Sequence, residues 1–146
     1  MTETRPEAAA GTTAAPPETL DDDPAVVQIM TRRVVALAPR TDLAVALTLM
    51  ADRQVRHLPV IDGETCIGIL HEIDVVRGIA VGVAAHAMVA ALARPAPVLD
   101  ARDRRSVAAR RLLDTDSDAA IVTERGAVSG ILTATDLVRS LATDIR

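Results

Sequence analysis

The sequence contains no phenylalanine, tyrosine or tryptophan among its 146 residues. Aliphatic side chains must therefore fill the hydrophobic core, and any flat ligand must be held between such side chains. The absence of aromatic rings also removes the platforms on which single-stranded nucleic acids stack. Basic residues number 16 against 20 acidic ones, and the resulting net charge of −4 disfavours a general binder of phosphate backbones. We therefore expect no nucleic-acid partner.

Cysteine and long apolar runs are equally scarce. Cys66 is the single cysteine, which excludes an internal disulfide and a cysteine-based zinc site and fits a reducing compartment. It stands in a short apolar run, so we interpret it as a small core residue rather than a redox sensor. The N-terminus has no signal-peptide pattern, and no apolar run approaches the roughly 18 residues of a membrane span. These observations predict a soluble cytoplasmic protein with no membrane partner.

The chain does contain an internal repeat. The segment GILHEIDVVR at residues 68–77 returns as GILTATDLVR at residues 130–139, 62 positions later (130 − 68). The same gapless shift superimposes Arg32 on Arg94 and Val60 on Val122. Each copy is one supersecondary unit that cannot bury its apolar face alone. Two copies are therefore expected to share a core and to create paired, pseudo-symmetric clefts.

The repeat divides the chain into a tail and one globular module. Residues 1–23 are rich in threonine, alanine, glutamate and proline and end in three aspartates, which is typical of a disordered acidic tail. Residues 24–82 are the first repeat and residues 83–146 the second. Half of the chain is too small to be safely stable alone, so the two repeats are expected to form one module.

The patterning predicts the order strand, helix, strand, strand, helix in each repeat, which is an α/β fold. In the first repeat the expected elements are a strand over 34–37, a helix that begins at Thr41-Asp42, hairpin strands over 57–61 and 66–70, and a helix over 72–80. Asp23-Pro24 is expected to cap a short entry helix over 25–30. In the second repeat the elements are expected over 97–99, 104–113, 119–123, 128–132 and 134–142.

Three motifs in this order resemble a pair of CBS (cystathionine-beta-synthase) domains. They are Ile29-Met30-Thr31 before the first strand, HLPVID at residues 57–62, and a strand ending in Gly-Ile-Leu followed by a helix that carries an aspartate. The resemblance implies a stand-alone module of the Bateman type, in which the repeats pack by small mixed sheets around a pseudo-twofold axis and leave two clefts. It also implies frequent homodimerisation and a regulatory adenosine ligand such as AMP, ADP, ATP or S-adenosylmethionine.

The resemblance also points to ligand-binding residues. In the family, the hydroxyl residue after Gly-x-x and the aspartate three positions later hold the ribose and phosphates, and Thr133 and Asp136 match this pattern. An aspartate in the first turn of a helix can accept hydrogen bonds from a ribose diol, beside backbone N–H groups that favour phosphate. The alternative is structural, because both residue types also stabilise a helix N-terminus. In the first repeat Asp74 is kept but His71 replaces the hydroxyl, so we expect the better site at Asp136.

Apolar residues at strand ends are expected to hold the adenine, namely Val35, Pro59, Pro97 and Ala119. His57 and His71 are expected to lie near each other at the open end of the first hairpin. Their spacing is not that of metal ligands on one element, so we predict no metal site. We interpret them as ordinary strand-end histidines, and a phosphate-facing or pH-tuned pair is the alternative.

Charged residues on the helices have ordinary interpretations. Arg77 and Arg139 are expected to pair with the aspartate three residues earlier on their helix. A group of arginines in the second repeat is interpreted as a solvated face, with a basic surface for an acidic partner, such as the tail of a neighbouring chain, as the alternative. Its members are Arg102, Arg104, Arg105, Arg110 and Arg111.

The sequence contains no nucleophile with a general base, no metal-ligand set and no glycine-rich phosphate loop, so we predict that the protein is not an enzyme. The first hypothesis is a homodimeric sensor of energy state, in which an adenosine nucleotide changes the packing of the repeats or of the dimer. It requires no cofactor beyond this regulatory ligand. The alternative is a ligand-independent dimerisation or protein-interaction module. Neither the ligand nor a regulated protein partner is named by the sequence.

Overall fold

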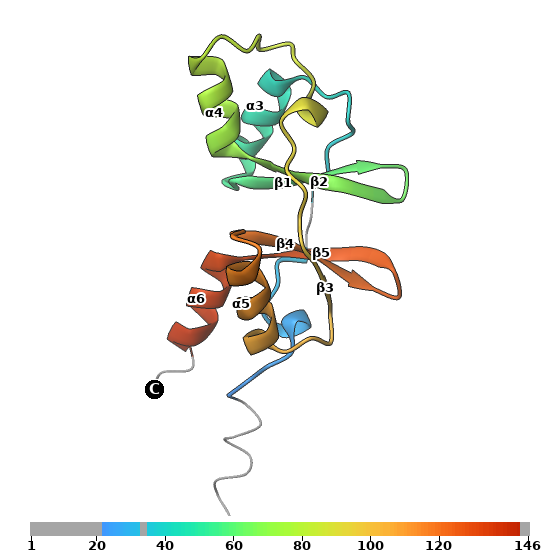
Figure 1. The fold of residues 1–146 in the computed structure, drawn as a ribbon, viewed down its shortest axis with the longest axis vertical. Helices are drawn as coiled ribbons and strands as arrows, with labels where there is room; N and C mark the ends of the chain where they lie inside the picture. The colour runs from blue at the N-terminus through green and yellow to red at the C-terminus, as the bar shows by residue number, and fades with distance from the viewer. Residues whose placement is uncertain (1–21, 33–34, 144–146) are drawn as a thin grey trace, which may run out of the picture.

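The computed structural model describes residues 22–32 and 35–143, and it consists of two similar halves whose sheets face each other (Figure 1). One half contains α3 (Leu43–Arg53), β1 (His57–Asp62), β2 (Thr65–His71) and α4 (Glu72–Ala80). The other contains β3 (Val98–Asp100), α5 (Arg105–Asp114), β4 (Ala119–Glu124), β5 (Ala127–Thr133) and α6 (Ala134–Thr143). The helices cover the outer sides of both sheets. The α/β class is confirmed, and so is the duplicated order of elements apart from the first strand of the first repeat.

Each half contains an antiparallel hairpin with a two-residue turn, as predicted. Strands β1 and β2 pair from His57 opposite His71 to Asp62 opposite Thr65, and β4 and β5 pair in the same way 62 positions later. Arg125 and Gly126 form the second turn with φ of +54° and +82°. This backbone twist suits a tight hairpin and explains the glycine. Both hairpins carry a register shift at the equivalent point, so the duplication extends to this irregularity.

The strand predicted over 34–37 is wrong for the described residues. Leu37 forms only an isolated parallel bridge with Val60, whereas its counterpart β3 pairs with β4 over three residues. Val34 lies outside the described residues.

Two prolines explain this difference between the halves. In the second repeat, the N–H groups of Ile121 and Ala101 extend the pairing of β3 with β4 by donating to carbonyls of the neighbouring strand, each at 2.9 Å. A shift of 62 positions places Pro59 and Pro39 at these sites, and proline has no N–H to donate. The first repeat therefore keeps the bridge at Leu37 and loses the bonds on either side of it.

The segment that leads into each repeat packs on the other repeat. We call residues 22–32 and 84–94 the lead-in segments. Val26 and Met30 of the first lead-in belong to the core of the second repeat, and Val89 of the second lead-in belongs to the core of the first. Figure 1 shows the blue turn at Val26–Gln28 beside α5 and the yellow turn at Val89–Ala91 beside α3. The two repeats are therefore joined by reciprocal exchange.

Glycines in β2 and β5 allow the lead-in segments to cross these strands. Thr31 pairs with Ile131, and Arg94 pairs with Ile69. A Cβ atom on Gly130, the neighbour of Ile131, would lie 2.7 Å from the carbonyl oxygen of Thr31. The equivalent Gly68 meets the carbonyl oxygen of Arg94 in the same way. The glycine of each Gly-Ile-Leu motif is therefore required by a close backbone approach.

The entry helix predicted over 25–30 is a single 3₁₀ turn, Val26–Gln28, and Asp23 does not cap it. The carboxylate of Asp23 instead accepts hydrogen bonds from the backbone N–H (2.8 Å) and hydroxyl (2.7 Å) of Ser106 in the first turn of α5. A carboxylate is favoured at the positive end of a helix, and this position belongs to the other repeat. The end of the acidic segment is thus attached to α5.

Arg105 departs from the predicted solvated face, because it is only 9% exposed. Its guanidinium donates to the carbonyl of Asp22 at 2.5 Å and to the hydroxyl of Ser140 at 3.3 Å. The acidic segment that it contacts is that of its own chain. Arg102, Arg104, Arg110 and Arg111 are exposed, as predicted.

A third apolar cluster joins the two sheets. It contains Ile69 of β2, Ile131 of β5, and Ala119 and Ile121 of β4, and the half-buried Cys66 packs against it. Burial raises the pKa of the Cys66 thiol, as expected for a partly buried residue that is not activated. Within the part of the chain that the structure describes, no helix has the length and apolar character needed to cross a membrane.

Candidate functional site

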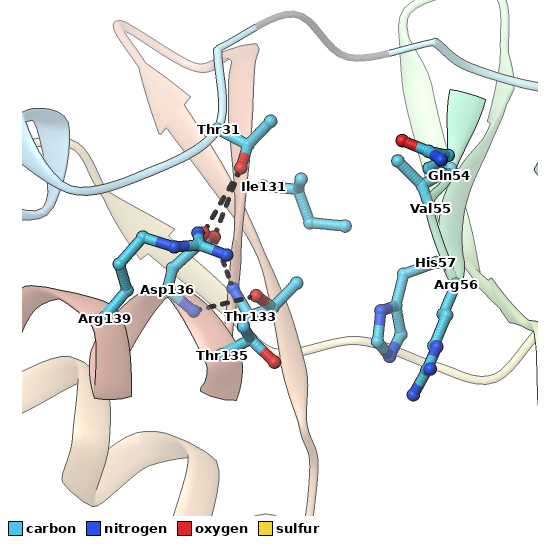
Figure 2. A pocket seen from close by; sticks show the side chains of 10 residues that line it. All are labelled: Thr31, Gln54, Val55, Arg56, His57, Ile131, Thr133, Thr135, Asp136 and Arg139. Carbon is cyan, nitrogen blue, oxygen red and sulfur yellow. Dashed lines mark hydrogen bonds and ion pairs between the residues drawn. The ribbon is translucent and has the colours of Figure 1, made fainter.

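A cleft of about 460 Å³ opens between the two repeats. Figure 2 shows its two walls, one formed by the first lead-in, β5 and α6, and the other by the residues between α3 and β1. The wall of the second repeat contributes Thr133 and Asp136, which the sequence predicted as ligand-binding residues. The lining residues are Thr31, Gln54, Val55, Arg56, His57, Ile131, Thr133, Thr135, Asp136 and Arg139.

Asp136 is 6% exposed and lies in the first turn of α6. Its carboxylate accepts a hydrogen bond from the Thr133 N–H at 3.0 Å, and its own N–H donates to the Thr133 hydroxyl at 3.1 Å. This reciprocal pair is a capping box, so the structural role considered from the sequence is present. The predicted pairing with Arg139 is also present, at 3.2 Å. A buried carboxylate held by the Thr133 N–H and by Arg139 is thus positioned at the cleft.

Thr31 is the contact to Asp136 that sequence reasoning missed. Its hydroxyl lies 3.4 Å from Oδ1 and 3.3 Å from Oδ2 of Asp136, and Figure 2 shows it reaching the carboxylate from the lead-in segment. Both distances are long for an O–H donor to a carboxylate, so the interaction is weak. Thr31 belongs to the motif that carries the family resemblance, which was the available signal.

An apolar chamber of about 280 Å³ adjoins the cleft and shares Thr31, Val55, His57 and Ile131 with it. Val35 and Pro59, two of the four residues predicted to hold adenine, line this chamber. A cavity lined mainly by aliphatic side chains suits a flat ring without aromatic stacking.

The outer part of the cleft carries positive charge. Arg56 and Arg139 line the cleft, and Arg53 lines the adjoining chamber. Arg56 and Arg139 have exposed side chains, at 83% and 67%, which leaves them able to reorient toward an anion. Sequence reasoning missed Arg53 and Arg56 because only the fold brings the end of α3 opposite α6.

The equivalent aspartate of the first repeat has a different partner. Arg94 of the second lead-in donates from Nε to Oδ2 of Asp74 at 2.5 Å and from Nη2 to Oδ1 at 2.6 Å. These hydrogen bonds hold the pKa of Asp74 below its ordinary value. The predicted pairing of Asp74 with Arg77 is thus replaced by a bond to the exchanged segment. Arg94 occupies the place that Thr31 has beside Asp136.

Pro97 and Ala119, the other two residues predicted to hold adenine, are the repeat counterparts of Val35 and His57. Ala119 is buried between the sheets, and Pro97 is half-buried and accepts a hydrogen bond from Ile121. The structure therefore does not bring these two residues into the cleft described at Asp136.

His57 and His71 lie side by side at the open end of the first hairpin, with ring centroids 4.9 Å apart. His57 Nε2 and His71 Nδ1 are each 3.3 Å from Oδ1 of Asp118, a residue of the second repeat that sequence reasoning did not single out. Burial, and then the neighbouring His57, lowers the pKa of His71 below its ordinary value. The neutral imidazole is therefore favoured at this position.

Two duplicated halves, α-β-β-α in the first repeat and β-α-β-β-α in the second, with exchanged lead-in segments and a cleft between them define a tandem α/β repeat module. A family model for the CBS domain matches residues 26–81 and again residues 89–143. The chain therefore belongs to the CBS domain family and is a tandem CBS pair.

Solved structures of CBS proteins are similar to this chain over most of its length. CBSX2 in complex with AMP is 28% identical, covers 84% of this chain and 98% of its own, and superimposes with a TM-score of 0.69. The CBS domain of the bacterial CNNM/CorC family Mg²⁺ transporter in complex with ATP is 19% identical, with coverages of 88% and 94% and a TM-score of 0.76. Hypoxic Response Protein I with two coordinated zinc ions is 24% identical, with coverages of 80% and 98% and a TM-score of 0.70. Comparison with curated protein sequences finds no match.

Proposed function

We propose that this protein is a regulatory module, not an enzyme, that binds an adenosine-containing nucleotide in the cleft at Asp136. The observation that carries the proposal is the buried Asp136 carboxylate, which lines a cleft that also contains Arg56 and Arg139 and adjoins a mainly aliphatic chamber. Modules of CBS domains are generally regulatory rather than catalytic. The AMP and ATP complexes of the similar CBS proteins support this class of ligand.

The proposed ligand spans the cleft from the chamber to the arginines. The adenine lies between Val35 and Pro59, and a ribose hydroxyl replaces the long hydrogen bond from Thr31 to Asp136. Phosphates or another anionic group lie near Arg139 and Arg56 and near the N-terminus of α6. Charge-assisted hydrogen bonds from arginine are among the stronger polar contacts in proteins.

The ligand contacts elements that both repeats and one lead-in segment supply. Displacing Thr31 from Asp136 changes how the first lead-in is held on the second repeat. A ligand shifts a conformational equilibrium only through its different affinity for the two states. The exchange of Thr31 for a ribose hydroxyl provides such a difference, and the resulting change in packing is the signal.

The test compares nucleotide-dependent thermal stability in two matched variants. AMP, ADP, ATP and S-adenosylmethionine are added separately, and unfolding is followed by circular dichroism. A ligand present at a hundredfold excess over its Kd stabilises the protein by about 2.7 kcal/mol. Asp136→Asn should abolish this stabilisation, while Asp74→Asn, the same change in the other repeat, should preserve it. Equal stabilisation of the wild type and Asp136→Asn contradicts the site, and no stabilisation by any of the four compounds contradicts the ligand class.

A second candidate function, dimerisation for protein interaction, is favoured by an exposed apolar surface on α4 and α6. These helices lie on the same side of the molecule in Figure 1. Their exposed apolar residues are Ile73, Val76, Ile79, Val138 and Leu141. Exposed patches of this kind are common at protein interfaces. A homodimer through this surface predicts that Val76→Glu yields a monomer by light scattering, whereas Val98→Glu, on the exposed part of β3, remains dimeric.

A further inference from the structure

The cluster of His57, His71 and Asp118 lies at the open end of the first hairpin, and its member His57 also lines the cleft proposed for the nucleotide. Two of its members are paired strand residues of the first hairpin, and the third precedes β4 of the second repeat. One ligand atom from each of the three side chains lies within 4.8 Å of the others. We propose that these three side chains bind a zinc-type divalent transition-metal ion that crosslinks the two repeats.

The distances favour coordination over a hydrogen bond. Both imidazole nitrogens are 3.3 Å from the same carboxylate oxygen of Asp118. A charge-assisted N–H···O bond is shorter, at about 2.7–2.9 Å. Two ligands of a tetrahedral ion with bonds of about 2.0–2.1 Å are about 3.3–3.4 Å apart, which matches the separation of Asp118 Oδ1 from each imidazole nitrogen.

The surroundings prepare the ligands for a metal. His71 is 6% exposed, so little solvent competes for its ring nitrogen, and an imidazole coordinates a metal in its neutral form. Strand pairing fixes both histidines, and the Asp118 carbonyl accepts the Ala134 N–H at 2.8 Å, which fixes the loop that carries the carboxylate. Arg94 is also near His71, and its charge is balanced by its bond to Asp74. Two imidazoles and a carboxylate suit zinc and leave one position open for water.

The duplication indicates that this cluster is specific to one half. The counterparts of His57, His71 and Asp118 are Ala119, Thr133 and Arg56, none of which is a usual zinc ligand. The histidine that departs from the hydroxyl pattern of the family is thus the residue that completes the metal cluster. We expect one ion per chain.

The test uses the tag-free full chain in a Cys66→Ser background, so that the thiol cannot bind the probe. Co²⁺ is titrated first, because its visible bands report tetrahedral coordination, and Zn²⁺ is then added to displace it. We expect one equivalent of tetrahedral Co²⁺ and full displacement by Zn²⁺. Losing a residue that only hydrogen-bonds to a metal ligand lowers metal affinity by roughly 10–100-fold. His71→Thr and Asp118→Asn each remove a direct ligand, so each should lower the Zn²⁺ affinity by more than this.

The matched control is His86→Ala, because His86 lies at the surface beside Asp42 with its Nδ1 3.5 Å from the carboxylate. This variant should bind Zn²⁺ like the parent. His71→Thr introduces the residue that the other repeat has at this position, Thr133. Asp118 is an exposed loop residue. At least one of the two variants is therefore expected to fold. The proposal is overturned by a parent protein that binds no Zn²⁺, or by His71→Thr and Asp118→Asn variants that bind it as tightly as the parent.

Discussion

Arg94 donates two parallel hydrogen bonds to Asp74 at the place where, in the other half, Thr31 donates one weak hydrogen bond to Asp136. Both donors belong to lead-in segments that cross from one repeat to the other. A bidentate arginine occupies both oxygens of the carboxylate, whereas a long threonine contact is readily displaced. This difference, together with His71 in the place of Thr133, makes the two aspartates unequal.

The first prediction rests on the proposed nucleotide function and restores the pattern of the second repeat in the first. Arg94→Thr combined with His71→Thr frees the carboxylate of Asp74 and supplies a hydroxyl at the preceding strand end. We expect the nucleotide stoichiometry measured by titration calorimetry to rise from one to two per chain. Arg32→Thr is the control, because Arg32 contacts only the carbonyl of Val27 among the bonds described. A double variant that still binds one nucleotide argues against the blocking role of Arg94.

The second prediction concerns the crossing at β5. Gly130→Ala places a methyl group 2.7 Å from the Thr31 carbonyl oxygen and 2.8 Å from the sulfur of Met30. We expect a loss of about 1–3 kcal/mol in the free energy of unfolding, as is typical of overpacking. Gly78→Ala is the matched control. A Cβ atom at position 78 would contact only side chains, the nearest atom being Cδ1 of Leu92 at 3.2 Å, and alanine has a higher helix propensity than glycine. Urea denaturation that gives equal stabilities for the two variants would falsify this account.

The third prediction concerns the cap of α5. Asp23→Ala removes the acceptor for the N–H and hydroxyl of Ser106, so unfolding should require about 1 kcal/mol less. Asp22→Ala should have a smaller effect, because Asp22 bonds Arg105 through its backbone carbonyl, which the substitution retains. Thermal melts at neutral pH compare the two. A greater loss in Asp22→Ala would point to its side chain instead.

The fourth prediction follows from the lowered pKa of His71. In the unfolded chain, His71 takes up a proton near the ordinary histidine pKa of 6.5. In the folded chain, His71 takes up a proton only at lower pH. The unfolded state therefore binds more protons in this window, and stability falls as the pH drops from about 7 through the folded pKa.

Urea denaturation between pH 7 and pH 5 with EDTA present measures this dependence without metal. His71→Thr should flatten the slope, while His86→Ala should leave it unchanged. Asp23, Asp74 and Asp100 also have lowered pKa values, but their contributions are lost only as the pH falls below the ordinary aspartate value of 3.8. A slope that persists in His71→Thr would assign the titration to another group.

The repeat in the sequence was sufficient to predict most of the fold, because a duplicated pattern of apolar residues and turns constrains both copies at once. The hairpins lie within one or two residues of their predicted bounds. No strand forms at Leu37 because Pro39 and Pro59 lack the N–H groups that strand pairing needs there. A pattern of apolar residues gives no sign of this. The motif around Thr133 and Asp136 located one wall of the cleft.

The other residues of the site depend on tertiary contacts that a gapless comparison obscures. The shift of 62 positions aligns Arg94 with Arg32, but the bridges show that Arg94 takes the place of Thr31, one residue away. Asp118 carries no motif and reaches the histidines only because the two sheets face each other. Local sequence patterns cannot predict such contacts between repeats.

The reciprocal exchange of the lead-in segments has a topological consequence. If the chain were cut between the repeats, each fragment would carry the lead-in that completes the other fragment's core. Neither fragment alone would regain a native core, whereas two fragments together would rebuild it as a swapped pair. The intact chain thus corresponds to a domain-swapped dimer of half-length units whose two subunits have been covalently fused.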